Sequence, residues 1–313
     1  MKAAQYQKYG GPEVIVINDN VAKPTPLKGQ LLVEVFAASL NPIDWKVRAG
    51  YLKEKAPLKF PITIGGNFSG VIVLLGDGVT KFKIGDEVYG QAIVLNGGSG
   101  SLAEFLVSNE DNSAIKPKNA SHIEAASLPL VGASAIQALE EHINLQKGQK
   151  ILIHGGAGGI GSIAIQLAKS KGAYVATTVR GDDIEFVKKL GADEVVDYKK
   201  EKFEEKLSGY DGVYDTVGGD TTDRSFKVLK KGGVLVSMLG EPNQDLAKEY
   251  GVKVVGQSTQ TNSKNLSRLA QLVDSGVIKP QVDKVFPLDQ TRQAFEYMET
   301  GHPKGKVVIS IKE

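Results

Sequence analysis

The sequence of 313 residues predicts an α/β fold with two domains, and three observations lead to this prediction. Short apolar segments separated by turn residues fill roughly the first 120 residues, which is typical of a compact, barrel-like β domain. From about Ser121 to residue 275, strand-like and helix-like segments alternate, as they do in a doubly wound parallel sheet. A glycine-rich turn joins one of these strands to the helix that follows it.

Strand signals in the N-terminal part are clearest in two segments. Residues 30–38 alternate partly between apolar and polar side chains, and residues 70–75 form an almost wholly apolar run. Strand character returns in residues 282–286 and 306–311, so we expect this tail to pack back on the N-terminal β domain. Turn signals punctuate the region at residues 10–12, 77–78, 85–86 and 96–98.

The alternating region supplies the elements of the second domain. We expect strands at residues 150–154, 174–178, 194–197, 211–216, 233–239 and 252–255. We expect helices at residues 122–142, 160–171, 182–190, 219–230 and 264–275. The second domain, residues 122–279, is therefore predicted to be an insertion in a domain built from residues 1–121 and 280–313. A ligand cleft is expected between the two domains.

Residues 150–161 read Lys-Ile-Leu-Ile-His-Gly-Gly-Ala-Gly-Gly-Ile-Gly and carry the most specific signal in the chain. In the pattern Gly156-x-Gly158-x-x-Gly161, the first glycine permits a tight turn and the second lets the backbone approach a pyrophosphate, while the third lets helix and strand pack closely. The helix that follows offers unpaired N–H groups and a partial positive charge to the pyrophosphate. We therefore predict a dinucleotide-binding loop; the alternative is a glycine-rich turn without a ligand. The loop is completed by Ala157, Gly159 and Ile160.

The end of the next strand indicates which dinucleotide binds. NAD-specific folds usually carry a carboxylate there, which holds the ribose hydroxyls. Here residues 174–179 lead into Arg180, and an arginine can bind a 2′-phosphate through a charge-assisted fork, whereas a carboxylate would repel it. We predict NADPH as the cofactor, with Thr178 and Arg180 at its phosphate; the alternative for Arg180 is a solvated surface residue. Asp182 and Asp183 are expected to form the cap and first turn of the next helix.

Composition excludes several other classes of function. The formal net charge of +2 gives no reason to expect nucleic acid as a partner, and no apolar stretch has the length of a membrane span. The absence of cysteine excludes disulfides, thiolate zinc sites and a cysteine nucleophile. We expect no metal, although a histidine–carboxylate site assembled by the fold stays open, and we expect a cytoplasmic protein because the N-terminus lacks a signal-peptide core. The histidines without metal-ligand spacing are His122, His142, His154 and His302.

Further motifs follow one another along nearly the whole chain. They are residues 38–46 (Ala-Ser-Leu-Asn-Pro-Ile-Asp-Trp-Lys), 85–90 (Gly-Asp-Glu-Val-Tyr-Gly), 125–129 (Ala-Ala-Ser-Leu-Pro), 190–193 (Leu-Gly-Ala-Asp), 197–198 (Asp-Tyr), 215–219 (Asp-Thr-Val-Gly-Gly) and 305–306 (Gly-Lys). In order and spacing, the chain resembles the zinc-independent quinone oxidoreductase branch of the medium-chain dehydrogenase/reductase superfamily. The resemblance implies a GroES-like, β-rich catalytic domain, an inserted Rossmann domain with a doubly wound parallel sheet, and a homodimer. It also implies NADPH-dependent reduction of quinones or α,β-unsaturated carbonyls.

The resemblance also assigns roles to particular residues. It places Asn41 near the nicotinamide or the substrate carbonyl, and Tyr198 near the adenosine phosphates. Zinc-dependent relatives carry cysteine and histidine ligands, and residues 41–44 of this chain contain neither. The predicted cofactor-binding set is completed by Val217, Gly218, Leu239 and Lys306.

Two residues are predicted to be catalytic. Hydride delivery leaves negative charge on the substrate oxygen, and the amide of Asn41 can donate a hydrogen bond to that oxygen without titrating. The alternative is that Asn41 only caps the turn before Pro42. Tyr51 is the second candidate, either as a donor or proton source or, alternatively, as a wall of the pocket. Where the family often has aspartate, this chain has Asn67, which loses the charge and either changes the role of that position or only supports a turn.

These inferences lead to one function and two alternatives. The leading interpretation is an NADPH-dependent reductase of quinones or activated double bonds. The first alternative is an enone or alkenal double-bond reductase with only incidental quinone activity. The second alternative is a non-catalytic NADPH-binding redox sensor.

Overall fold

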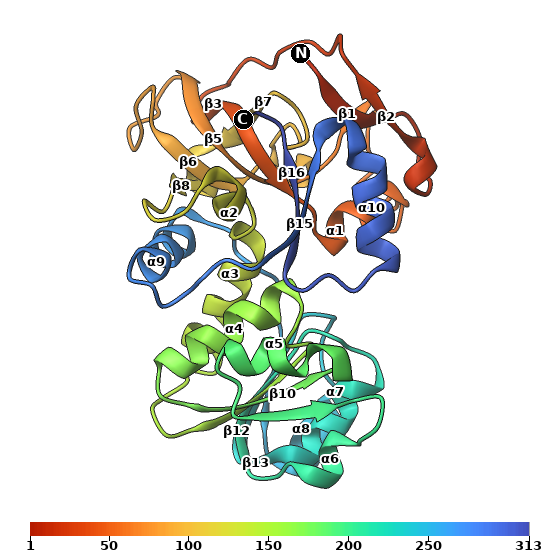
Figure 1. Cartoon of the computed structure of the whole chain (residues 1–313), viewed down its shortest axis with the longest axis vertical. Coiled ribbons are helices and arrows are strands. Elements are labelled where there is room, and N and C mark those ends of the chain that lie inside the picture. Colours follow the sequence, from red (N-terminus) through yellow and green to blue (C-terminus); the bar gives the residue numbers. More distant parts are fainter. Residues whose placement is uncertain (313) are drawn as a thin grey trace. The chain divides into compact units, whose positions relative to one another are not determined.

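Two units make up the fold, which a computed structural model describes for residues 1–312 (Figure 1). The first unit comprises Met1–Leu130, Thr261–Ser275 and the chain from Pro280 onwards. The second unit comprises Val131–Gln260 and Gly276–Lys279. The first is rich in β-strands and the second is built on a parallel sheet, so the α/β class predicted from the sequence is confirmed.

Mostly antiparallel sheets form the first unit. Within residues 1–312, its larger sheet has seven strands, in which β7 pairs with β3 beside the main order β15-β16-β3-β5-β6-β8. Its smaller sheet has the order β2-β1-β4. The strand bounds are β1 (Ala3–Tyr6), β2 (Ile15–Asn18), β3 (Gln30–Ser39), β4 (Ile62–Thr63), β5 (Asn67–Leu75), β6 (Glu87–Gln91), β7 (Phe105–Asn109), β8 (Ser113–Ile115), β15 (Val282–Pro287) and β16 (Lys306–Ser310).

The long strand β3 supplies the centre of one core in this unit. Its alternate residues Leu31, Val33 and Val35 are completely buried and pack with Phe68 of β5 and Leu106 of β7. Burying such side chains stabilises a fold by roughly 1.5–3 kcal/mol each. The helices of this unit are α1 (Pro42–Arg48), α2 (His122–Ala126), α9 (Ser263–Asp274) and α10 (Thr291–Thr300), of which α10 lies beside β2 (Figure 1).

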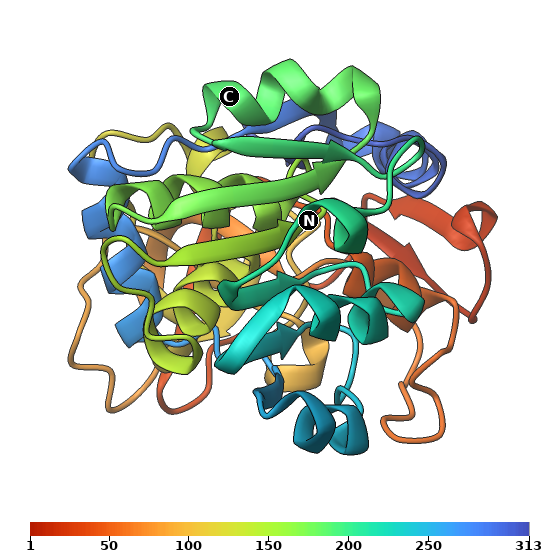
Figure 2. The same ribbon diagram turned by 90° about the horizontal axis from the view of Figure 1, so that it is seen from below.

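A parallel sheet with the order β11-β10-β9-β12-β13-β14 forms the second unit (Figures 1 and 2). The chain leaves β9 towards β10 and β11 and then returns to the other side of β9 to form β12, so the strand order reverses there. In open parallel sheets, ligands bind at such a point, outside the carboxyl ends of the strands. The bounds are β9 (Lys150–His154), β10 (Tyr174–Val179), β11 (Glu194–Asp197), β12 (Tyr210–Asp215), β13 (Leu229–Ser237) and β14 (Lys253–Gly256).

Helices pack against this sheet and bury its central strands. Ile151, Leu152 and Ile153 of β9 are all fully buried, which explains why this strand is continuously apolar rather than alternating. Helix α4 packs on β9 and β10, and α7 packs on β12 and β13. The helix bounds are α3 (Pro129–Ile136), α4 (Gly159–Ser170), α5 (Ile184–Lys189), α6 (Phe203–Lys206), α7 (Asp220–Ser225) and α8 (Gln244–Tyr250).

The single helix predicted for residues 122–142 is wrong. The structure divides it into α2, α3 and a π-helical turn at Gln137–His142. Pro129 begins α3, and a proline disfavours helical backbone in the residue before it, which separates the two helices. The predicted helix 219–230 is also too long, because α7 ends at Ser225 and a 3₁₀ turn and β13 follow.

The boundaries between the two units differ from the predicted 1–121, 122–279 and 280–313. Helix α2 belongs to the first unit, where the hydroxyl of Ser39 donates to the carbonyl of Ala126 at 2.8 Å. Helix α9 also belongs there, because the hydroxyl of Tyr89 in β6 donates to the carbonyl of Leu266 at 2.6 Å. Sequence alternation places α9 in the second unit because it follows β14, whereas its contacts place it against β8.

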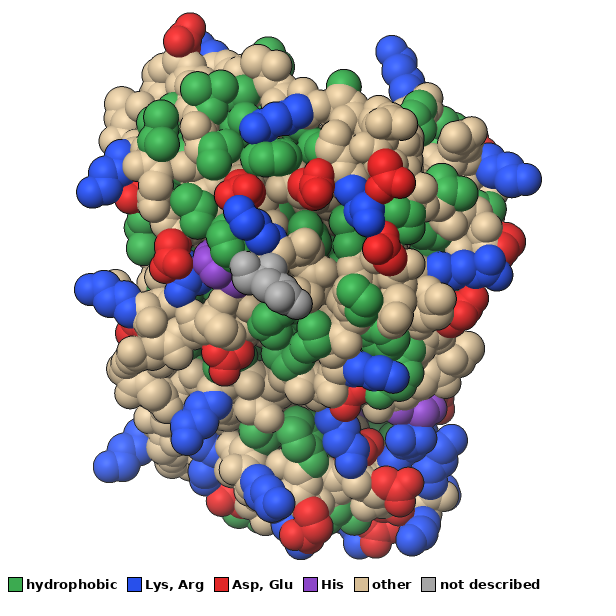
Figure 3. All heavy atoms as spheres, turned by 45° about the horizontal axis from the view of Figure 1, so that its top comes forward, with side chains coloured by type: hydrophobic (Ala, Val, Ile, Leu, Met, Phe, Trp, Pro, Cys, Tyr) green, Lys and Arg blue, Asp and Glu red, His purple; other side chains and the backbone are tan. Residues whose placement is uncertain are grey.

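Two further features of the structure concern membranes and charged partners: the length of its helices and the distribution of charge on its surface. None of the helices in residues 1–312 combines the length and apolar character needed to cross a membrane. On the face drawn in Figure 3, lysines and arginines are interspersed with acidic side chains rather than gathered by sign. Such a mixed surface agrees with the small net charge.

Candidate functional site

The three glycines of the turn after β9 have different surroundings. A Cβ on Gly156 would lie 2.1 Å from Oγ1 of Thr177, and one on Gly161 would lie 2.3 Å from the carbonyl oxygen of Gly155. The protein itself therefore leaves no room for a side chain at these two positions. A Cβ on Gly158 would meet nothing closer than the Gly155 oxygen at 3.4 Å, an ordinary contact.

The space at Gly158 fits a ligand outside the protein chain. Gly158 is the N-cap residue of α4, with ordinary extended backbone (φ −75°), and α4 begins at Gly159. The N-terminus of this 12-residue helix presents unpaired N–H groups and a partial positive charge. The fold does not itself require glycine at 158, and the open space there leaves room for the close approach of the pyrophosphate that the sequence predicts. The turn is completed by the half-buried Ala157, Gly159 and Ile160.

A second loop follows β12 and is shaped by a buried carboxylate. Asp215 accepts hydrogen bonds from the backbone N–H groups of Val217 at 2.8 Å and Gly218 at 3.0 Å. Gly218 has φ +79°, and a Cβ on it would lie 2.7 Å from Cβ of Leu239. Glycine is therefore required here both by the backbone conformation and by the close approach of the segment after β13.

The two loops meet where the strand order reverses. Thr216 donates through its hydroxyl to the carbonyl of His154, the last residue of β9, at 2.8 Å. The side chains of Val217 and Leu239 beside them are about half exposed, at 52% and 50%. The structure thus brings the predicted residues Val217, Gly218 and Leu239 to the same sheet edge as the glycine turn.

His154 lies completely buried beneath this edge. Its Nδ1 is 2.9 Å from Oγ1 of Thr178, and its Nε2 is 3.0 Å from Oγ of Ser225. Ser225 donates its own proton to the carbonyl of Thr221, so Nε2 carries the proton and Nδ1 accepts from Thr178. Burial lowers the pKa of His154 to about 4, which keeps the ring neutral. The hydroxyl proton of Thr178 is therefore engaged inside the protein rather than offered to a phosphate.

Arg180 directly follows the last residue of β10, at the carboxyl ends of the strands. Its side chain is 31% exposed, and its Nε lies 3.8 Å from Oδ2 of Asp183 without a hydrogen bond to any of residues 1–312. Asp183 stands at the N-cap position of α5, as the sequence predicts. The neighbouring strand β11 ends at Asp197, and the residue after it, Tyr198, is half exposed and donates its N–H to the carbonyl of Val179 at 3.1 Å. Arg180 and Tyr198 thus lie on adjacent strand ends.

In the first unit, Asn41 lies at the start of α1 and is only 1% exposed. Its backbone N–H donates to Oδ2 of Asp44 at 2.7 Å. Lys306 of β16 donates to the carbonyl of Leu40 and, at 2.6 Å, to Oδ1 of Asn41. The amide nitrogen Nδ2 of Asn41 is buried and makes no hydrogen bond within residues 1–312.

Asp44 and Lys306 are both buried beside Asn41. Burial raises the pKa of the Asp44 carboxyl and lowers the pKa of the Lys306 ammonium, while each charge attracts the other. The structure places the ammonium of Lys306 against Asn41, whereas its contact with a cofactor stays a prediction. The contact between Asn41 and Asp44 was not predicted, although a capping residue followed three positions later by an acid is a known helix-start signal.

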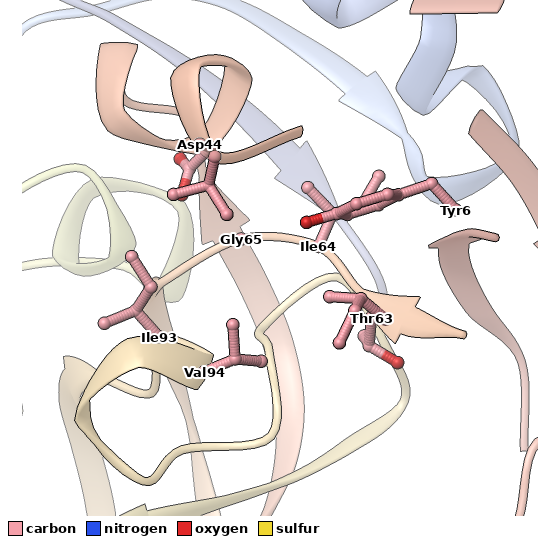
Figure 4. A pocket seen from close by; sticks show the side chains of 9 residues that line it. Tyr6, Asp44, Thr63, Ile64, Gly65, Ile93 and Val94 are labelled. Carbon is pink, nitrogen blue, oxygen red and sulfur yellow. The ribbon is translucent and has the colours of Figure 1, made fainter. Parts of the chain in front are cut away.

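A small pocket lies next to Asp44 in the same unit (Figure 4). The hydroxyl of Tyr6 points from the ring towards Gly65 in this view, whereas most of the wall is apolar. The pocket is lined by Tyr6, Asp44, Val47, Ile62, Thr63, Ile64, Gly65, Ile93 and Val94.

Tyr51 and Asn67 have contrasting surroundings. Tyr51 is 71% exposed and sets its ring edge-on to Trp45, with centroids 5.5 Å apart. Asn67 is fully buried at the start of β5, where its amide donates to Oγ of Ser39 at 3.3 Å and its oxygen has no partner within residues 1–312. Position 67 therefore supports the pairing of β3 with β5 rather than a turn. In the part of the chain described here, no group of three or more His, Cys, Asp or Glu side chains is placed to hold a metal ion.

Comparisons with known proteins identify the family. A family model described as alcohol dehydrogenase GroES-like domain matches residues 27–118, and one described as zinc-binding dehydrogenase matches residues 190–309. The chain is 41% identical to the 2-methylene-furan-3-one reductase of Solanum lycopersicum and 39% identical to the chloroplastic NADPH-dependent alkenal/one oxidoreductase of Arabidopsis thaliana. Each match covers 99% of this chain and 79% of the relative. The solved quinone oxidoreductase from Coxiella burnetii superposes with a TM-score of 0.92 at 36% identity, covering 100% of this chain and 99% of that one.

The GroES-like unit and the parallel-sheet unit with its glycine turn define a two-domain dehydrogenase or reductase. The chain belongs to the quinone oxidoreductase branch of the medium-chain dehydrogenase/reductase superfamily. The resemblance inferred from its motifs is confirmed.

Proposed function

We propose that this protein is an NADPH-dependent, zinc-independent oxidoreductase that transfers a hydride to a quinone or an α,β-unsaturated carbonyl. The observation that carries the proposal is the buried amide of Asn41, whose oxygen is held by Lys306 and whose nitrogen lacks a partner within residues 1–312. A buried, unsatisfied donor costs free energy, so it calls for an acceptor that is absent from the chain itself. The carbonyl oxygen of a quinone or enone is such an acceptor.

Residues of the second unit are proposed to hold the cofactor. The turn Gly156–Gly161 would receive the pyrophosphate, with Val217, Gly218 and Leu239 lining the dinucleotide. Arg180, with Thr178 and Tyr198 nearby, would receive the 2′-phosphate. NADPH supplies the hydride when it is bound.

Asn41 is proposed to stabilise the charge that develops on the substrate oxygen. Negative charge grows on this oxygen as the hydride arrives, and a donor fixed in advance in a low-dielectric site stabilises it more than water would. Tyr51 is the proposed proton source, because its phenolic O–H is a hydrogen-bond donor and its side chain is exposed. A tyrosine that only forms the pocket wall would leave the rate unchanged when replaced by phenylalanine.

The substrate class follows from a panel of acceptors. The purified full chain is mixed with NADPH and a two-ring quinone, a short enone or a primary aldehyde, and the loss of NADPH absorbance is recorded. The names of the two relatives reported above favour the enone as the better substrate. Rapid quinone reduction with little enone turnover would instead favour quinones. Tight NADPH binding without oxidation by any acceptor would indicate the non-catalytic redox sensor and overturn the proposal.

Zinc independence and assembly need separate tests. The chain has no cysteine to serve as a thiolate ligand, so incubation with a chelator should leave the activity unchanged. A homodimer is proposed by family analogy, and analytical ultracentrifugation should report twice the chain mass. A cytoplasmic location is proposed because a cysteine-free chain needs no oxidising compartment, and cell fractionation tests it.

A further inference from the structure

We propose that Lys306 is a positioning residue that fixes the carboxamide of Asn41 with its N–H groups directed at the substrate oxygen. This inference rests on the proposed function, because it explains how the amide of Asn41 becomes a donor in that reaction. The residues concerned, Leu40, Asn41, Asp44 and Lys306, all belong to the first unit.

The contact with Lys306 settles which end of the amide faces the ammonium. A lysine ammonium has three N–H donors and no acceptor, so only Oδ1 of Asn41 can lie 2.6 Å from Nζ. The reversed amide would set its own NH₂ group against the ammonium. The nitrogen is therefore held on the other side of the carboxamide, where it has no partner within residues 1–312.

Burial of Lys306 is not explained by a gain in folding stability. The residue is only 6% exposed, and the acceptors of its ammonium are the neutral carbonyl oxygens of Leu40 and Asn41. Burying an ammonium against neutral acceptors costs free energy that an apolar side chain would not. Asp44 compensates part of this cost by attraction. A charge kept at such a cost is typical of a functional site.

The ammonium also makes the amide a stronger donor. The positive charge of the Lys306 ammonium beside Oδ1 draws electron density from the amide nitrogen, so the N–H groups of Asn41 bind an anionic oxygen more strongly. This gain is largest when charge has developed on the substrate oxygen. Loss of Lys306 should therefore lower kcat more than it raises the KM for the carbonyl substrate.

A double-mutant cycle tests whether Lys306 acts through Asn41. Lys306→Met, Asn41→Ala and the double variant are compared with wild type in enone reduction at saturating NADPH. By analogy with the loss of one oxyanion donor, kcat should fall about 100-fold in Asn41→Ala and about 10- to 100-fold in Lys306→Met. The double variant should be no slower than Asn41→Ala, because the lysine has nothing left to position. A double variant whose loss is the product of the two single losses would overturn the proposal.

Three further variants separate positioning from folding and from cofactor binding. Lys306→Arg keeps the charge and the donors and should recover much of kcat, whereas Lys312→Met removes an exposed lysine and should leave kcat within about twofold of wild type. Asn41→Asp keeps an oxygen for Lys306 but loses the N–H donors, so it should fold and bind NADPH yet reduce the enone slowly. If Lys306→Met does not fold, Lys306→Arg takes its place: turnover well above that of Asn41→Ala supports the proposal, and a folded Lys306→Arg as slow as Asn41→Ala overturns it.

A measurement without cofactor gives an independent readout. In ¹H–¹⁵N spectra of the free protein, the side-chain amide signal of Asn41, assigned by its loss in Asn41→Ala, should shift in Lys306→Met but not in Lys312→Met. An unmoved signal, or Lys306→Met that loses NADPH affinity while kcat stays normal, would overturn the proposal. If the proposed function itself were wrong, the wild-type protein would reduce no acceptor at all, which distinguishes this outcome from failure of the proposal for Lys306 alone.

Discussion

Oγ1 of Thr177 occupies the space in which a side chain on Gly156 would begin, since a Cβ there would lie only 2.1 Å away. Thr177 cannot easily move, because it is fully buried and donates to the carbonyl of Ile153 at 2.6 Å. Gly158, two residues along the same turn, has no such neighbour. The fold therefore requires glycine at position 156 but not at position 158, where the proposed pyrophosphate would lie.

Alanine substitutions at Gly156 and Gly158 should have different effects, one on folding stability and the other on NADPH binding. Gly156→Ala should lower the free energy of unfolding by about 1–3 kcal/mol through overpacking, whether or not NADPH is present. Gly158→Ala should fold with normal stability, because its backbone suits alanine, but its methyl group would meet the pyrophosphate and weaken NADPH binding at least about tenfold. Thermal unfolding without cofactor and calorimetric titration with NADPH measure the two effects. Normal NADPH affinity in Gly158→Ala would contradict the placement of the pyrophosphate.

Arg180 should decide between the two dinucleotides. Arg180→Ala should raise the KM for NADPH by about 10- to 100-fold, the range expected for a lost hydrogen bond to a charged group, and hardly change the KM for NADH. Steady-state kinetics with both cofactors measure this difference. Lys188→Ala is a matched control, since it removes an exposed positive charge of the same unit. Equal losses for both cofactors would refute the assignment of Arg180 to the 2′-phosphate.

The amide of Asn41 should matter for the chemical step. Asn41→Ala removes the donor and should lower kcat about 100-fold, while the KM for NADPH stays near the wild-type value. Steady-state enone reduction measures both constants. Asn20→Ala replaces an exposed asparagine of the same unit and should behave as wild type. Unchanged kcat in Asn41→Ala would leave the residue with the capping role alone.

His154 should make the fold sensitive to acid. The pKa of His154 in the folded state, about 4, lies below its unfolded value of 6.5, so between these values only the unfolded chain binds the proton. The stability contributed by the neutral ring is thus present above about pH 6.5 and is lost as the pH falls towards 4, by about 2 kcal/mol at pH 4.5. His154→Asn should be less stable at pH 7 but should lack this part of the pH dependence.

Denaturant unfolding at several pH values checks this expectation. His302→Asn replaces an exposed histidine and should keep the wild-type pH dependence. If His154→Asn and wild type lose stability in parallel between pH 7 and 4.5, His154 is not the responsible group.

Local patterns in the sequence were sufficient for much of the fold. Every expected strand of the parallel sheet occurs, with its ends displaced by a few residues, because buried apolar runs and glycine turns are local signals. The interruption between α2 and α3 could have been read from Pro129. The sequence could not show that α9 belongs to the first unit, because this depends on contacts such as that between Tyr89 and Leu266.

The candidate site was less accessible to sequence reasoning. Asn41 and Lys306 were both selected, but by separate motifs and for separate roles. Their contact joins residues 265 positions apart, and no local pattern reports such a pairing. The engagement of Thr178 with His154 likewise depends on the neighbouring strands β9 and β10 lying in register.

The position of Lys306 on β16 has a consequence for biosynthesis. Asn41 is translated early, but its contact with Lys306 cannot form until 265 more residues have been translated. A polypeptide that ends between Lys279 and β16 would contain the whole second unit with its glycine turn but would lack Lys306. On the role proposed for Lys306, such a chain should reduce the enone slowly. Lys306 must therefore be translated before the proposed donor at Asn41 can be held in place.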